Sequence, residues 1–308
     1  MKTSRRDFLK TGLALAAAAS AGRFTRAFAA DAPPAASAPR TILAAVRDGS
    51  RTAMLDRALA ELGGLGRFVQ PGQTVLIKPN IGWDVAPDLG ANTHPELVGH
   101  LVKLCRDAGA KSVSVFDHTC DQWQKCYANS GIEAAVKDAG GIVVTGDDQS
   151  LYRPVQIPRG VKLKSAEVHA LVLDSDVFIN VPVLKHHSGS LMTGAAKNLM
   201  GVVWDRRFYH RNDLHQCIAD FLTFKTPTLN IMDAYHPMVR NGPRGRAAED
   251  VVELRSLLAS TDIVAIDTAA ARLLNQDPAN IRHIGLAAAH GVGTTNLESI
   301  DIRRVKLA

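Results

Sequence analysis

A short, continuous apolar run followed by an amphipathic helical pattern recurs along the chain. Residues 74–77, 112–116 and 177–181 are such runs, and each is typical of a strand buried on both faces. Helical patterns follow at residues 93–108 and 132–139. Because strands that alternate with helices build parallel or mixed sheets, the pattern predicts a Rossmann-like α/β fold with helices on both faces.

The same patterns predict the remaining elements. Further strands are expected at residues 41–46, 142–144, 228–232, 254–258 and 300–305, and further helices at residues 52–62, 189–203, 214–224, 263–274 and 277–290. Residues 153–172 contain alternating stretches that indicate antiparallel or edge strands. Thr93 and Glu96 have the spacing of a capping box, and Asp213 and Asp262 are expected to be N-caps.

Polar side chains follow several of the predicted strands. Lys78 and Asn80 come after one strand, and Asp117, Lys185 and Asp233 come after three others. In open α/β sheets, ligands bind outside the carboxyl ends of the strands. These five side chains are therefore expected to converge on one site.

The first residues have the pattern of an export signal. Ser4 to Lys10 read S-R-R-x-F-L-K, an apolar run at residues 12–19 is too short to span a bilayer, and Ala27-Phe28-Ala29 resembles a cleavage site. We expect a twin-arginine signal at residues 1–29, a disordered linker at 30–40 and one domain at 41–308. The twin-arginine translocase would then deliver the protein to the periplasm with no stable membrane span; an uncleaved amphipathic anchor is the alternative.

The predicted mature chain has nearly balanced charge. Removing the six basic residues and one acidic residue of the signal from the totals of 36 and 30 leaves 30 and 29. A general surface for nucleic acid or anionic membranes is not indicated.

The four cysteines are Cys105, Cys120, Cys126 and Cys217. An oxidising compartment permits a Cys120–Cys126 disulfide. The sequence has no C-x-x-C motif, so it does not encode a closed cysteine cage for zinc or an iron–sulfur cluster.

The stretch 176–203 holds the densest group of reactive side chains. Lys185, His186 and His187 follow an apolar strand, and only one of the two consecutive histidines is expected to face the site. Small residues then precede Lys197 and Asn198, and they leave room for a ligand.

Four other residues are candidates. His210 and His215 are five apart, so one helix does not place both on the same face. Arg244 lies in a glycine-rich turn that could hold an anion or could be a plain surface turn. Asp267, one turn into its predicted helix, could face the site.

The sequence resembles the domain-of-unknown-function 362 family over about residues 41–307. The matching segments are Lys78-Pro79-Asn80, the helix start at Thr93, Asp117 after its strand, and the segments 180–187, 193–201, 241–245 and 260–267. The family's activity is largely unassigned. Many members carry an added iron–sulfur module that this chain lacks.

A more distant resemblance is to lactate racemases that use a nickel-pincer nucleotide. His187, Lys197 and one of His210 or His215 occur in the order of that family's catalytic histidine, cofactor-tethering lysine and nickel-binding histidine. Asp117-His118-Thr119 is similar to its Asp-x-Thr-Arg motif, with Cys120 in place of the arginine. The resemblance implies a shared site position, and we carry over nothing of the racemase reaction.

These observations favour an exported enzyme that acts on a small anionic substrate and depends on a divalent metal or a nucleotide-type cofactor. The expected catalytic residues are His187, Lys197 and Lys185. His187 would exchange protons near neutral pH, and Lys197 would hold the cofactor or substrate. The remaining expected roles are substrate or cofactor binding for Lys78, Asn80, Asn198 and Arg244, and metal binding for His215 and Asp117. The alternatives are a non-catalytic periplasmic binding or maturation protein, or a subunit of an iron–sulfur system with a redox partner.

Overall fold

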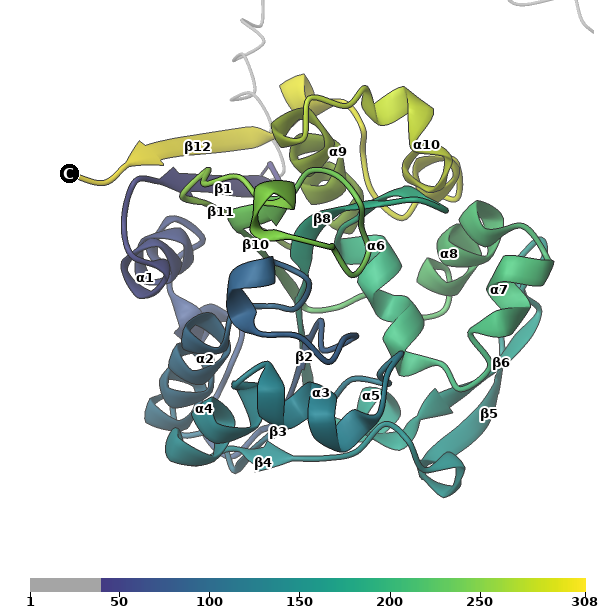
Figure 1. Ribbon diagram of the computed structural model, residues 1–308, viewed down its shortest axis with the longest axis horizontal. Coiled ribbons are helices and arrows are strands. Elements are labelled where there is room, and N and C mark those ends of the chain that lie inside the picture. Colours follow the sequence, from purple (N-terminus) through teal and green to yellow (C-terminus); the bar gives the residue numbers. More distant parts are fainter. Residues whose placement is uncertain (1–39) are drawn as a thin grey trace, which may run out of the picture. The chain divides into compact units, whose positions relative to one another are not determined.

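The computed structural model describes residues 40–308. The predicted export signal and all but the last residue of the predicted linker lie outside the described residues. Within them, ten strands form one mixed sheet, and helices pack on both of its faces (Figure 1). The predicted fold class is thus confirmed.

The elements have the following bounds. The strands are β1 Ile42–Arg47, β2 Thr74–Pro79, β3 Ser112–Val115, β4 Ile142–Val143, β5 Tyr152–Gln156, β6 Ser165–His169, β7 Val177–Val181, β8 Val183–His187, β9 Leu191–Thr193, β10 Leu229–Met238, β11 Ser256–Ser260 and β12 Asp301–Lys306. The α-helices are α1 Arg51–Glu61, α2 Pro95–Asp107, α3 Trp123–Asn129, α4 Ile132–Asp138, α5 Ala170–Asp174, α6 Ala195–Asn198, α7 Arg207–Arg211, α8 Leu214–Leu222, α9 Ile263–Leu273 and α10 Arg282–Ala289. Short 3-10 turns are η1 Leu65–Arg67, η2 Pro87–Leu89, η3 Gln149–Leu151, η4 Leu199–Val202, η5 Ala248–Asp250, η6 Pro278–Asn280 and η7 Leu297–Ser299.

The strand order of the main sheet is β12-β1-β11-β10-β7-β2-β3-β4. Neighbours from β10 to β4 are parallel, whereas β11 is antiparallel to both β1 and β10. Strands β5 and β6 form a separate antiparallel pair, as predicted for residues 153–172. None of the helices between residues 40 and 308 is long and apolar enough to cross a bilayer.

The sheet separates two hydrophobic cores. Val75 and Ile77 of β2 contribute to the core beneath α1, α2 and α4, and Leu76 between them contributes to the core beneath α6, α8 and α9. Side chains alternate between faces along a strand, so a strand covered on both sides must be apolar throughout. The continuous apolar runs in the sequence have this cause.

A proline divides the strand that leads to the site. Pro182 lacks an N–H, so it cannot continue the ladder of β7, and the chain resumes as β8 alongside the long strand β10. Lys185, His186 and His187 therefore lie within β8, and the sequence did not predict this second strand.

The predicted helix at residues 189–203 is wrong. This segment forms β9, the one-turn helix α6 and the 3-10 turn η4. At Gly194, an added Cβ would overlap the Asp267 carboxylate, which accepts hydrogen bonds from the backbone N–H groups of Ala195 (2.5 Å) and Ala196 (2.9 Å). This tertiary contact sets where α6 begins.

Several local predictions also need correction. Helix α2 is capped by His94, because the Thr93 hydroxyl instead donates to the carbonyl oxygen of Val181 at 2.7 Å. Asp233 lies inside β10 and not after it. Further corrections are the strand predicted at 254–258, which is displaced to Ser256–Ser260, and the helix predicted at 277–290, which is divided into η6 and α10.

The N-cap predictions for Asp213 and Asp262 are confirmed, since both side chains accept backbone N–H groups at the starts of α8 and α9. The Cys120–Cys126 disulfide that an oxidising compartment would permit is not formed. Cys126 is a buried free thiol, and Cys120 is exposed.

Candidate functional site

A cavity of about 820 Å³ lies at the carboxyl ends of β2, β3 and β8. The chain segment from Thr193 to His210 contributes the other wall, with Lys197, Trp204, Arg206 and Arg207. The position agrees with the expectation that the strand ends form one site.

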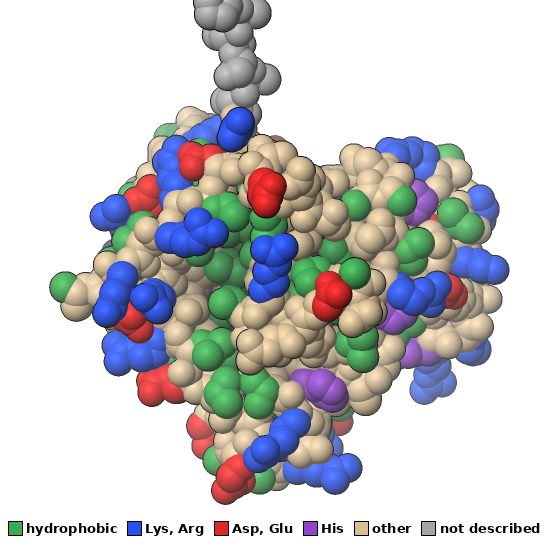
Figure 2. Space-filling view, turned by 90° about the horizontal axis from the view of Figure 1, so that it is seen from above, with side chains coloured by type: hydrophobic (Ala, Val, Ile, Leu, Met, Phe, Trp, Pro, Cys, Tyr) green, Lys and Arg blue, Asp and Glu red, His purple; other side chains and the backbone are tan. Residues whose placement is uncertain are grey.

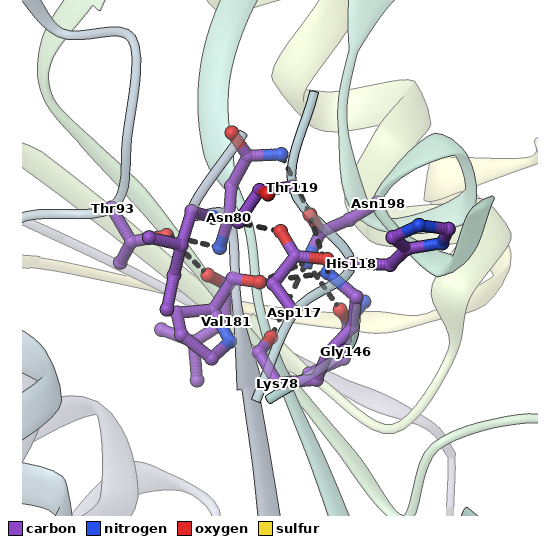
Figure 3. Close-up of polar contacts among 12 residues, drawn as sticks. Lys78, Asn80, Thr93, Asp117, His118, Thr119, Gly146, Val181 and Asn198 are labelled. Carbon is purple, nitrogen blue, oxygen red and sulfur yellow. Dashed lines mark hydrogen bonds and ion pairs between the residues drawn. The ribbon is translucent and has the colours of Figure 1, made fainter. Parts of the chain in front are cut away.

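A buried ion pair lies behind the cavity wall. The Lys78 ammonium contacts the Asp117 carboxylate at 2.8 Å, and both side chains are almost fully buried. The other Asp117 oxygen accepts the backbone N–H of Ile81 at 2.7 Å. Figure 3 shows the Lys78 and Asp117 side chains close together, with Lys78 near the end of β2 and Asp117 in the loop after β3. Burial lowers the pKa of Lys78, and Asp117 opposes that effect.

A chain of side-chain amides joins the ion pair to the cavity. The Asn198 Oδ1 accepts from Lys78 (3.2 Å) and from the Asn80 amide (2.9 Å) (Figure 3). The Asn198 Nδ2 donates to Asn180, and Asn180 donates to Asn230. Buried polar networks of this kind are rigid when their members are satisfied. The network fixes α6, and with it Lys197, against three strands.

The cavity lysines differ in their partners. Lys185 donates to the Asn80 Oδ1 at 3.0 Å and to the carbonyl oxygen of Ala91. Lys197 reaches the Met200 sulfur at 3.4 Å, and a thioether is a weak acceptor. Burial, partly offset by Cys120, lowers the pKa of Lys185 to about 7 and that of Lys197 to about 8.

Two imidazoles face the cavity with opposite hydrogen-bonding roles. The His187 Nδ1 accepts the backbone N–H of Gly189 at 3.0 Å, which assigns the proton of the neutral ring to Nε2. The His118 Nδ1 lies 3.2 Å from the carbonyl oxygen of Val203, so it must carry the proton and leave Nε2 as an acceptor. His118 also stacks on Trp204.

Both rings stay neutral at neutral pH. Burial, with Lys197 and Lys185 adding to it, lowers the pKa of His187 to about 2. Burial and the Arg206 charge lower the pKa of His118. This differs from the expectation that His187 titrates near neutral pH.

Cations without a carboxylate partner surround the cavity. In the described part of the chain, no ion pair involves Lys185, Lys197, Arg206 or Arg207. The Arg206 guanidinium instead donates to the carbonyl oxygens of His118 (2.8 Å) and Thr119 (2.5 Å) and so fixes the loop after β3.

The acidic groups of the lining are mostly neutralised. Asp117 is paired with Lys78, and Asp205 is paired with Arg211 at 3.2 Å. Asp147 is the remaining acidic residue of the lining. The excess of unpaired positive charge suits an anionic ligand.

Most of the predicted site residues come together. The cavity is lined by Asn80, Asp117, Lys185, His187, Lys197 and Asn198. Lys78 is not part of the lining, but it contacts Asp117 and Asn198 behind the cavity wall. Of the two histidine pairs left open by the sequence, His187 and His210 line the cavity. The His186 Nδ1 instead accepts the backbone N–H of Gly242 at 3.1 Å.

Other predicted positions lie elsewhere. His215 contacts the buried His283, with the two Nδ1 atoms 3.1 Å apart, and it is not part of the cavity lining. Arg244 is exposed and lies 3.5 Å from Asp121, although Pro243 beside it lines the cavity. Asp233 contacts the N-terminus of α2 through the His94 N–H, and Asp267 holds α6. Long-range packing, which spacing does not encode, sets these positions.

Of the two residues expected to bind a metal, Asp117 lines the cavity and His215 does not. Between residues 40 and 308, no group of three or more metal-ligating histidine, cysteine or acidic side chains is present.

Sequence reasoning missed Arg206, Arg207, Trp204 and the thiol of Cys120. The available signal was a tryptophan and two arginines directly after the small-residue segment.

The basic side chains visible in Figure 2 are dispersed among acidic ones over that face of the molecule. This arrangement agrees with the balanced composition of the predicted mature chain.

Similar solved structures share little sequence with this chain. The lactate racemase apoprotein from Thermoanaerobacterium thermosaccharolyticum is 11% identical with a TM-score of 0.49, over 76% of this chain and 57% of that one. A Thermotoga maritima protein is 8% identical with a TM-score of 0.44, over 77% of this chain and 59% of that one. The chain thus spans less than two thirds of either structure.

Sequence comparison gives a longer match. The Thylakoid-associated protein sll1697 of Synechocystis sp. is 29% identical over 269 residues, which cover 81% of this chain and 78% of that protein. Residues 2–22 match the twin-arginine translocation pathway signal sequence, which indicates export across a membrane by the twin-arginine translocase. Residues 75–272 match the Domain of unknown function (DUF362), and the chain therefore belongs to the DUF362 family.

Proposed function

We propose that this exported protein is a periplasmic enzyme that binds a small anionic substrate in the cavity and transfers a proton on it. The observation that carries the proposal is the charge of the lining, where Lys185, Lys197 and Arg206 have no carboxylate partner among the described residues. A bound carboxylate or a similar anion would pair with these cations, and the cavity side chains would need little rearrangement.

The two cavity imidazoles suit proton transfer. The His118 Nε2 is an acceptor and would take a proton from the substrate, and the His187 Nε2–H would donate a hydrogen bond to the substrate oxygen. A bound anion would also raise the low pKa of His187, because it would offset the charges of Lys185 and Lys197.

The proposal includes a nucleotide-type cofactor as an optional occupant. A cavity of about 820 Å³ has room for more than a small acid, and Trp83 and Trp204 offer aromatic surfaces in its lining. A metal would need ligands from the substrate or cofactor, since the described residues do not assemble three protein ligands. Native mass spectrometry and elemental analysis of the exported protein test both possibilities.

Thermal unfolding in the presence of small anions tests the proposal. Lactate, oxalate, phosphate and sulfate should raise the melting temperature, and a ligand at 100 times its Kd stabilises the fold by about 2.7 kcal/mol. The Lys197→Met variant should lose most of this shift. The control Lys103→Met, at an exposed lysine paired with Asp107, should keep it.

The outcomes separate the proposal from its alternatives. No anion-dependent shift in the wild type, or an equal shift in Lys197→Met, would contradict an anion site in this cavity. Tight binding without turnover of any bound acid would instead indicate a non-catalytic binding or maturation protein.

A further inference from the structure

Lys197 differs from the other two lysines of the site. The Lys78 ammonium is paired with the Asp117 carboxylate. The Lys185 ammonium donates hydrogen bonds to two oxygen atoms, from Asn80 and Ala91. In the described part of the chain, the Lys197 amine contacts only the Met200 sulfur within hydrogen-bonding distance. Its hydrogen-bonding capacity is therefore largely unused, and the side chain lines the cavity.

The surroundings of Lys197 favour the neutral amine. Burial lowers its pKa to about 8, and the Arg206 charge acts in the same direction against the opposing effect of Cys120. A lysine that is desolvated near other cations becomes a nucleophile at neutral pH. At pH 7 a fraction of Lys197 is in this reactive form.

The same cavity offers what a carbonyl substrate with a carboxylate needs. Arg206 and Arg207 line it and carry positive charge for the carboxylate, and Lys185, whose pKa is about 7, adds a partial charge at pH 7. The His118 Nε2 can accept a proton from the amine adduct and return it to the departing oxygen, and the His187 Nε2–H can donate a hydrogen bond to that oxygen.

We propose that Lys197 forms an imine with the carbonyl carbon of a small 2-oxo acid bound in this cavity. The inference rests on the proposed function and narrows its substrate class. The amine lone pair attacks the carbonyl carbon and forms a C–N bond. The carbonyl oxygen then leaves as water, with both protons taken from the lysine nitrogen, and a C=N bond remains.

Reductive trapping tests the proposal. The protein lacking residues 1–29 is incubated with pyruvate and cyanoborohydride, and its peptides are analysed by mass spectrometry. Hydride reduces the imine to a secondary amine, so the peptide with Lys197 should gain the mass of pyruvate less one oxygen atom. The Lys197→Arg variant should yield at least about tenfold less adduct, because arginine keeps the charge and forms no imine.

Two controls define the result. Lys103→Arg, at an exposed lysine of α2, should give the wild-type adduct, and lactate, which has no carbonyl, should compete with pyruvate without being trapped. The thermal unfolding of Lys197→Arg is measured alongside, so that loss of fold is not mistaken for loss of reaction.

The possible outcomes are distinguishable. If small anions stabilise the protein but pyruvate gives no adduct, or gives adducts only on exposed lysines, the imine is overturned and the anion site stands. If neither stabilisation nor adduct occurs, both proposals fail. An adduct on Lys197 in both the wild type and the Lys103→Arg variant supports the imine.

Discussion

At the scale of single residues, the site is defined by buried amines with different partners. Lys78 is neutralised by Asp117, whereas Lys185 and Lys197 are held by neutral groups. A buried ammonium without a counter-ion is costly, so its pKa falls. The charge of the cavity therefore depends on pH within the range in which the protein would work.

Anion binding should weaken as pH rises. The pKa values of about 7 for Lys185 and about 8 for Lys197 mean that both lose their charge between about pH 6 and pH 9. Affinity for oxalate, measured by titration at several pH values, should fall over this range. In Lys197→Met, the part of the pH dependence near pH 8 should be absent. An affinity that does not change with pH would contradict these assignments.

The Lys78–Asp117 pair should behave as one unit. Replacing Lys78 with Met leaves a buried carboxylate without its cation, which costs about 3–5 kcal/mol. The double variant Lys78→Met/Asp117→Asn should cost less than the two single variants together, because no buried charge remains. Urea denaturation of the four proteins measures this coupling. Additive costs would show that the pair is not a unit.

The sequence predicted site residues where they adjoin a strand end. Asn80 and Asp117 reach the cavity for this reason, whereas Lys185 reaches it from within β8, and Asp233 lies inside β10 and does not line it. Sequence reasoning failed for His215 and Arg244, whose positions depend on α10 and on Asp121, far away in sequence. Contacts of that kind leave no local pattern.

At the scale of elements, glycines decide how β9, α6 and η4 fit the site. The segment has the composition of a helix, but Gly194 and Gly201 lie where the chain approaches other elements closely. At Gly201 an added Cβ would overlap the Asp117 carboxylate, and the Gly201 carbonyl accepts the His118 N–H at 3.1 Å. The helix prediction for residues 189–203 failed because tertiary contacts overrode local propensity.

The Gly201→Ala variant should be destabilised by about 1–3 kcal/mol, because the methyl group must displace the Lys78–Asp117 pair. Gly285→Ala is the matched control. Gly285 lies in α10 with open space at its Cβ position, so alanine there should stabilise the fold by up to about 1 kcal/mol. Thermal unfolding compares the two. Equal effects would show that Gly201 is not under steric constraint.

At the scale of the whole molecule, buried histidines should limit stability in acid. Burial lowers the pKa of His283 to about 3 and the pKa values of His94 and His169 to about 4. The unfolded pKa is about 6.5, so the unfolded state binds more protons as pH falls below that value. Stability is then lost on acidification from about pH 7 toward these folded pKa values.

His283 offers a specific test of this prediction. It is a fully buried residue of α10 that contacts His215 of α8, and its low folded pKa should cost on the order of 1–2 kcal/mol of stability at about pH 5. The decrease in melting temperature between about pH 7.5 and pH 5 should be smaller in His283→Leu than in the wild type. An equal decrease in the two proteins would show that His283 does not cause the acid sensitivity.

The fold class was predictable because strands that are buried on both faces appear in the sequence as continuous apolar runs. The apolar runs of β2, β3 and β7 mark strands that are covered on both faces, and their locations were predicted to within a few residues. The second strand β8 was not predicted, because after Pro182 the chain changes its neighbour and continues alongside β10. Strand pairing is a property of the whole sheet.

The most direct test of the central claim is a calorimetric titration of the protein lacking residues 1–29 with oxalate at about pH 7. The cation-lined cavity predicts saturable binding at one site in the wild type and in Lys103→Met, and strongly reduced binding in Lys197→Met. Absence of binding, or binding of equal strength in all three proteins, would contradict an anion site at Lys197.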